Sequence, residues 1–171
     1  MYNNGNNRFN NRPNQTYGQT PPSIQPVKAE PLPEDYVKKA EDAILILQQI
    51  EKNNKPKDGK VITTSKLRSL FSLFSETYNE VIRGDQEKLT PPQVGVLSAA
   101  KVRVYYEIGR EDGYRGTLDS GSVGRFVKYS KLLEYLYDIG DSCEKLIKFY
   151  HYMEALVAFH RYYFGEKRDN R

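Results

Sequence analysis

The chain is poor in the residue types that build covalent or metal chemistry. Its 171 residues include one Cys, two His and no Trp. A single Cys excludes an intrachain disulfide and a Cys-rich zinc site, because structural zinc takes four ligands drawn mainly from Cys and His. His151 and His160 are nine positions apart, so on one helix they would lie on opposite faces and could not bind one ion together.

Two kinds of reactive site, a di-metal site and an activated cysteine, remain open as alternatives, and the residues favour neither. A ferritin-like di-metal site would pair His151 and Glu154 with carboxylates such as Glu107 and Glu111, but each of those two has an arginine neighbour that predicts an ion pair instead. Cys143 falls in the first turn of a predicted helix, where the dipole lowers a thiol pKa, but no base can be assigned to it. We therefore expect no enzyme activity, no cofactor and no metal.

The sequence also lacks the marks of a membrane or exported protein. No uncharged apolar run approaches the roughly 18 residues of a membrane span. The N-terminal letters MYNNGNNRFNN contain no basic segment followed by an apolar stretch. We expect a cytoplasmic protein with no membrane partner.

Apolar residues are scarce in residues 1–34, which hold seven Asn and six of the nine Pro. Such a composition cannot bury enough surface to offset the entropy of ordering, so it predicts a disordered Asn/Gln/Pro-rich arm. Residues 35–166 are predicted to form one folded domain, and residues 167–171 a short C-terminal tail.

Beyond the arm the apolar residues recur at helical spacing and never alternate for long, which predicts an all-α, five-helix bundle. A Ser/Thr cap, prolines and glycines set several of the ends. The expected helices cover 35–53, 63–84, 90–112, 122–139 and 141–164. The last of them is apolar nearly all round, so it is either central to the bundle or shared with a partner.

The net charge is small, at +4 from 26 basic and 22 acidic residues, but the cations have informative positions. Lys66 and Arg68 fall in the first turn or so of the second helix, where the dipole favours anions over cations. A bound phosphate, held by the free N–H groups and the hydroxyls of residues 63–65, would resolve this conflict. An ordinary Ser/Thr cap with incidental cations is the alternative.

Further cations are spread over the last three helices. Arg103, Glu107 and Arg110 share one face at spacing i, i+4, i+7, while Lys101 lies on an apolar stripe and must reach the rim or meet a partner. Cations mixed with abundant Tyr suit a surface that follows a phosphate backbone without reading bases. The candidate RNA-binding residues are Lys66, Arg68, Lys101, Arg103, Arg110, Lys128, Lys131 and Arg161.

Three strings carry a resemblance to a known family: ITTSKLR at 62–68, KVRVYYEIGRE at 101–111 and YMEALVAFHRYY at 152–163. Together, in this order and spacing, they closely resemble the small subunit of type III-A CRISPR-Cas effector (Csm) complexes. The similarity covers roughly residues 35–167. Arg68, Lys101 and Arg110 are the strongest candidates among the cations that these strings contain.

The resemblance implies a prokaryotic, non-catalytic subunit that acts in antiviral defence. Copies of it would stack into a filament beside the backbone and large subunits and hold the duplex of CRISPR RNA and target RNA through sequence-independent backbone contacts. From the residues alone, a helical protein–protein adaptor that makes no direct RNA contact stays open as the alternative.

Overall fold

The described part of the chain is helical, as the apolar spacing predicted. A computed structural model describes residues 27–53, 61–111 and 116–165, which form no strand, only an isolated bridge between Lys88 and Ser142. The all-α prediction is confirmed. These residues form α1 (Tyr36–Asn53), α2 (Thr64–Val81), α3 (Pro91–Gly109), the 3₁₀ turn η1 (Leu118–Ser120), α4 (Ser122–Tyr129), α5 (Leu132–Asp138) and α6 (Cys143–Phe164).

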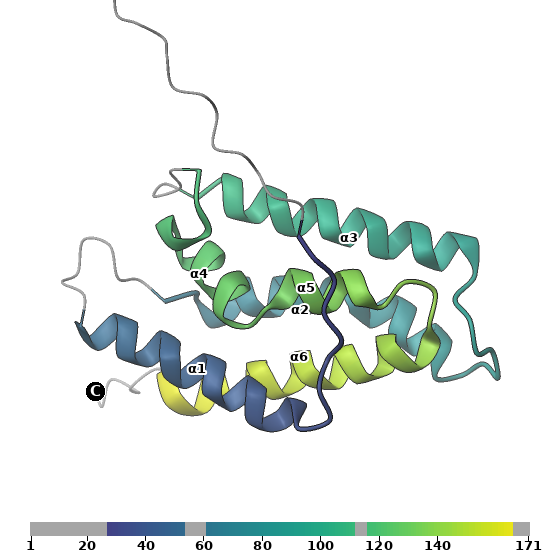
Figure 1. Cartoon of the computed structure of the whole chain (residues 1–171), viewed down its shortest axis with the longest axis horizontal. Helices are drawn as coiled ribbons and strands as arrows, with labels where there is room; N and C mark the ends of the chain where they lie inside the picture. The colour runs from purple at the N-terminus through teal and green to yellow at the C-terminus, as the bar shows by residue number, and fades with distance from the viewer. Residues whose placement is uncertain (1–26, 54–60, 112–115, 166–171) are drawn as a thin grey trace, which may run out of the picture.

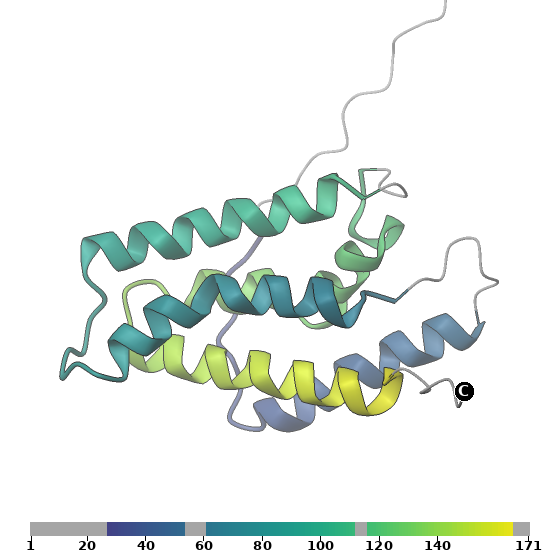
Figure 2. The same cartoon turned by 180° about the vertical axis from the view of Figure 1, so that it is seen from behind.

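The bundle is built around α6. This helix packs against α1 on one side and α2 on the other, and α3 lies along the far side of α2 (Figures 1 and 2). Eight residues of α6 are buried inside the chain's own core, including Phe149, Met153 and Leu156. The predicted all-round apolar helix is therefore central to the bundle, and its buried faces need no partner protein.

Two helices replace the single one predicted over 122–139, because the chain breaks between α4 and α5. Lys131 adopts a left-handed conformation with φ 50°. The carbonyl of Ser130, which a continuous helix would use internally, instead accepts a hydrogen bond of 2.6 Å from the buried Tyr152 hydroxyl. The next helix restarts with the Tyr135 N–H donating to the Lys131 carbonyl. Neither glycine nor proline marks this break in the sequence.

Residues 27–34, predicted to belong to the disordered arm, form an extended stretch that crosses α5 (Figure 1). Val27 and Leu32 pack against the core, and the Glu30 N–H donates to the Glu134 carbonyl. The packed chain thus begins before the predicted boundary at residue 35, because these few apolar side chains pack against the core. Residues 1–26, residues 54–60 between α1 and α2, and the tail after 165 lie outside the described residues.

Two glycines at the start of α4, Gly121 and Gly124, pack closely against neighbouring groups. A Cβ on Gly124 would come within 2.5 Å of the Leu118 carbonyl oxygen, and one on Gly121 within 2.5 Å of a Glu111 carboxylate oxygen. Both glycines are buried. They allow η1 and α4 to fold back against the C-terminal end of α3, where the polar side chains converge.

Candidate nucleic-acid interface

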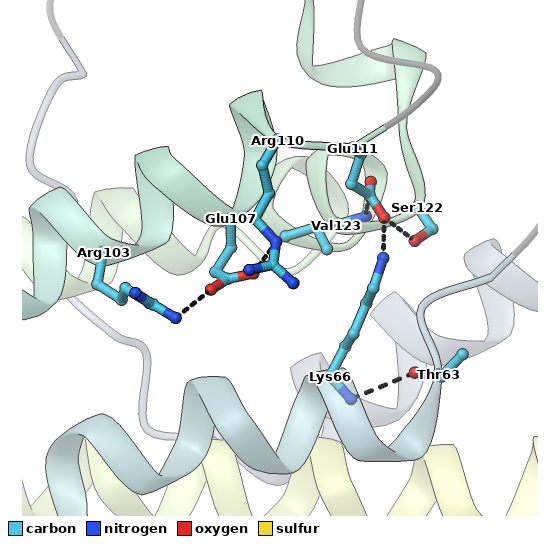
Figure 3. Close-up of polar contacts among 8 residues, drawn as sticks. All are labelled: Thr63, Lys66, Arg103, Glu107, Arg110, Glu111, Ser122 and Val123. Carbon is cyan, nitrogen blue, oxygen red and sulfur yellow. Dashed lines mark hydrogen bonds and ion pairs between the residues drawn. The ribbon is translucent and has the colours of Figure 1, made fainter.

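A small groove between α2 and α3 gathers three of the eight predicted cations. It encloses about 240 Å³, and its lining joins residues far apart in the sequence. The lining residues are Ser65, Lys66, Ser69, Leu70, Arg103, Glu107, Arg110 and Val123. Figure 3 shows the three cationic side chains extending into the space between the two helices.

Glu107 joins the two arginines of this groove. Its carboxylate lies 2.8 Å from a terminal nitrogen of Arg103 and 3.1 Å from Nε of Arg110 (Figure 3). Spacing i, i+4, i+7 had predicted that the three residues share one face, and they do. Glu107 is nearly buried, whereas both arginine side chains are half exposed. A guanidinium carries five N–H donors, so each arginine keeps donors for an anion while Glu107 fixes its position.

Lys66 closes the groove at its other end. Its ammonium donates to Glu111 at 2.6 Å, and the same carboxylate accepts bonds from the Ser122 hydroxyl at 2.6 Å and the Val123 N–H at 2.8 Å (Figure 3). Burial works to raise the pKa of Glu111, but these donors together outweigh it and hold the pKa below its usual value. The charged Glu111 carboxylate, just after α3, thus bonds to Lys66 on α2 and to Ser122 and Val123 at the start of α4.

The first turn of α2 is capped in the ordinary way. The Thr63 hydroxyl accepts from the Lys66 N–H at 3.2 Å, and the Thr64 hydroxyl lies 3.5 Å from His160 Nδ1. The Lys66 ammonium is paired with Glu111, and Ser65 and Lys66 line the groove whereas Arg68 does not. The capping alternative describes Thr63, and a phosphate at this turn stays a prediction.

The remaining predicted cations are dispersed. Arg68 is exposed on α2 and does not line the groove, and Arg161 is exposed near the end of α6. The Lys101 ammonium sits 4.6 Å from the centre of the Tyr137 ring on the α5 side of α3, which is the partner that its place on an apolar stripe required.

Two lysines near the α4–α5 break are held by carboxylates. Lys128 donates to both oxygens of Asp119, at 2.7 and 2.6 Å. Lys131 donates to both oxygens of Glu30, at 2.8 and 2.9 Å. Their partners raise the pKa of each lysine. Both lysines were predicted to bind RNA, and spacing within one helix could not reveal these pairs because Asp119 and Glu30 lie outside it.

Tyr106 belongs to the groove's surroundings and was not predicted. Tyr106 is 54% exposed, and the guanidinium carbons of Arg103 and Arg110 lie over its ring, 5.0 Å and 5.8 Å from the ring centre. The signal was present in the sequence, since cations three positions before and four after an aromatic residue share its helix face.

The residues considered for metal or thiol chemistry have other partners. Glu107 and Glu111 are taken by the arginines and Lys66, and His151 lies 2.9 Å from Glu154 in an exposed pair. Cys143 is buried. Within the described ranges no three His, Cys, Asp or Glu side chains cluster as metal ligands would. Among the helices described, none combines the length and the apolarity that a membrane crossing demands.

Fold and site together define a class: an all-α bundle whose groove between two helices is lined by cations. A profile of the family described as Csm2 Type III-A matches residues 40–166. The chain therefore belongs to the type III-A Csm2 family, the small-subunit family that its residue strings resemble.

Individual relatives agree with the family match. The chain is 36% identical over 129 residues to a protein named CRISPR system Cms protein Csm2 from Mycobacterium tuberculosis (strain CDC 1551 / Oshkosh), an overlap covering 75% of this chain and 91% of that one. A protein of the same name from Streptococcus thermophilus is 33% identical over 133 residues, or 78% and 94% of the two chains. One from Enterococcus italicus is 29% identical over 123 residues, or 67% and 83%.

Proposed function

We propose that this chain is a non-catalytic structural subunit of a type III-A CRISPR RNA-guided effector complex, acting in antiviral defence in the prokaryotic cytoplasm. Its partners are CRISPR RNA, target RNA, the backbone and large subunits, and further copies of itself stacked in a filament. It holds the RNA duplex by its sugar-phosphate backbone, while base pairing between the two RNA strands supplies the sequence specificity.

The observation that carries this proposal is the convergence of Lys66, Arg103 and Arg110 from two helices on one groove. Two half-exposed guanidiniums held in place by a shared carboxylate are pre-organised to donate to phosphate oxygens. Such contacts recognise the backbone and not the bases.

Partial neutralisation of the groove fits a subunit that works in several copies. Glu107 lies within the groove and Glu111 directly behind it, so the attraction of one groove for phosphate is modest. When copies are lined up along one RNA, each contact raises the effective concentration of the next, and modest sites together bind firmly.

A protein–protein adaptor is the second candidate, and the outer face of α3 favours it. Gly95, Ala99 and Val102 are exposed and uncharged, and Val102 is 69% exposed. An apolar strip of this kind suits contact with a protein. Contact between stacked copies would use such a strip as well, so the strip alone does not separate the two candidates.

Co-purification from a native host distinguishes them. A tagged copy of the chain should bring down the large and backbone subunits together with CRISPR RNA. Protein partners recovered after mild nuclease-free washing but without RNA would favour the adaptor. A tagged chain that recovers no complex subunit would overturn the proposal.

A further inference from the structure

The exposed Tyr106 ring, which contacts two arginines of the groove but does not line it, is left unexplained by backbone binding. It is a large aromatic side chain with 54% of its surface open to solvent. The ring does not belong to the hydrophobic core and stacks on no other ring among the described residues. Among the described residues it makes cation–π contacts with Arg103 and Arg110, whose guanidinium groups lie over the ring. The ring is therefore outside the core, and the part that the guanidiniums leave open is available to a ligand.

The surroundings of the ring define the kind of ligand. Arg103 and Arg110 flank it along the helix, and Glu107 holds both guanidiniums through separate carboxylate oxygens. An exposed aromatic ring that is contacted by two fixed guanidinium groups matches one nucleotide. The base would stack on the part of the ring that the guanidiniums leave open, while the phosphates of the nucleotide accept hydrogen bonds from the arginines.

We propose that Tyr106, together with Arg103 and Arg110, forms a stacking platform for an unpaired RNA base. The inference rests on the proposed RNA-binding function and adds a contact to a base where that function requires only contacts to the backbone. The faces of a paired base are already covered by its neighbours in a duplex, so the ligand is a nucleotide that is single-stranded or displaced from the helix.

Charge argues against a protein as the occupant. The flanking guanidiniums are half exposed, and covering them with an apolar protein surface would remove them from water without a counter-charge beyond Glu107. The nearby apolar strip of Gly95, Ala99 and Val102 is the part of α3 better suited to a protein contact.

The chain contains no Trp, so a Tyr106→Trp variant of the full chain carries a single fluorescent reporter at the platform. Its emission is recorded while single-stranded oligouridine is added at low salt, and again with an oligonucleotide of equal length and charge whose bases have been removed. Stacking quenches the indole, so we expect saturable quenching by oligouridine and about tenfold weaker binding of the abasic strand.

Substitutions separate stacking from charge in the otherwise unchanged protein, with binding read by polarisation of labelled RNA. Tyr106→Leu should lose the preference for the base-containing strand and keep the salt dependence of binding, whereas Tyr106→Phe should keep both. Tyr162→Leu is the matched control, because Tyr162 is 79% exposed on α6, on the other side of α2 from α3 (Figure 2).

The outcomes are distinct. Salt-dependent binding of both strands with equal affinity would overturn the platform and leave the proposed function standing. Binding of neither strand by the unchanged chain would overturn the platform, whereas the proposed function is tested separately by co-purification of the complex. If Tyr106→Leu abolished recovery of a partner subunit but kept the preference for bases, the ring would be a protein contact and the platform would be wrong.

Discussion

Lys66 and Glu111, 45 positions apart, form an ion pair of 2.6 Å that joins the start of α2 to the end of α3. The Glu111 side chain is only 9% exposed, whereas that of Lys66 is 40% exposed. The carboxylate also receives the Ser122 hydroxyl and the Val123 N–H, so one acidic group fixes three segments around the groove. The position of Lys66 therefore depends on a carboxylate that is not itself among the lining residues of the groove.

Replacing Glu111 by Gln should lower the free energy of unfolding by about 2 kcal/mol, because it removes a charge-assisted bond and leaves mismatched donors. Urea unfolding followed by far-UV circular dichroism measures this. The lowered pKa means that the native state binds fewer protons than the unfolded chain. The stabilisation is complete above the ordinary pKa of 4.5 and is lost as pH falls through the lower folded-state value. A Gln variant with unchanged stability at neutral pH would contradict the claim that the Glu111 carboxylate stabilises the fold.

The left-handed Lys131 should be a site of strain. Lys131→Ala removes the exposed ion pair to Glu30 and keeps the unfavourable conformation. Lys131→Gly removes both, so the Gly variant should be about 1 kcal/mol more stable than the Ala variant. Both variants lack the ion pair to Glu30, so its loss does not affect the difference between them. Thermal unfolding of the two variants measures that difference. A Gly variant less stable than the Ala variant would show that the break carries no strain.

His160 should make stability depend on pH near neutrality. Its Nε2 lies 2.7 Å from the Ile62 carbonyl, which can only accept, so Nε2 carries the proton of a neutral ring. Burial lowers the pKa of His160 below its usual 6.5. The unfolded chain then binds more protons, and stability falls as pH drops from 6.5 towards the folded-state pKa. In His160→Gln the urea midpoint should change less between pH 7.5 and 5 than in the unchanged chain. An equal change in both proteins would rule out His160 as the source.

The helical fold could be predicted because apolar spacing and cap residues are local signals. Tyr36–Asn53 and the Thr63 cap of α2 lie where they were expected. The break at Lys131 could not be predicted, since it depends on a hydroxyl that arrives from Tyr152 on another helix. The packing of residues 27–34 likewise depends on core side chains and on the Glu134 carbonyl, which come together only after folding.

The candidate site could be predicted only in part, because only its contacts within one helix leave a local signal in the sequence. The shared face of Arg103, Glu107 and Arg110 follows from spacing within one helix. Which cations from other helices join them is set by packing, so Lys66 could not be distinguished from Arg68 in advance. The pairing of Lys128 and Lys131 with distant carboxylates was hidden for the same reason.

The most direct test of the central claim compares the salt dependence of RNA binding in two double variants of the full chain. Arg103→Gln with Arg110→Gln removes the groove arginines, and Lys38→Gln with Arg83→Gln removes two exposed cations that are not candidate RNA-binding residues, at equal change in net charge. The plot of log affinity against log salt concentration should become shallower by about one unit or more for the groove variant and change much less for the control. Equal slopes for the unchanged chain and the groove variant would contradict the claim that this groove holds RNA.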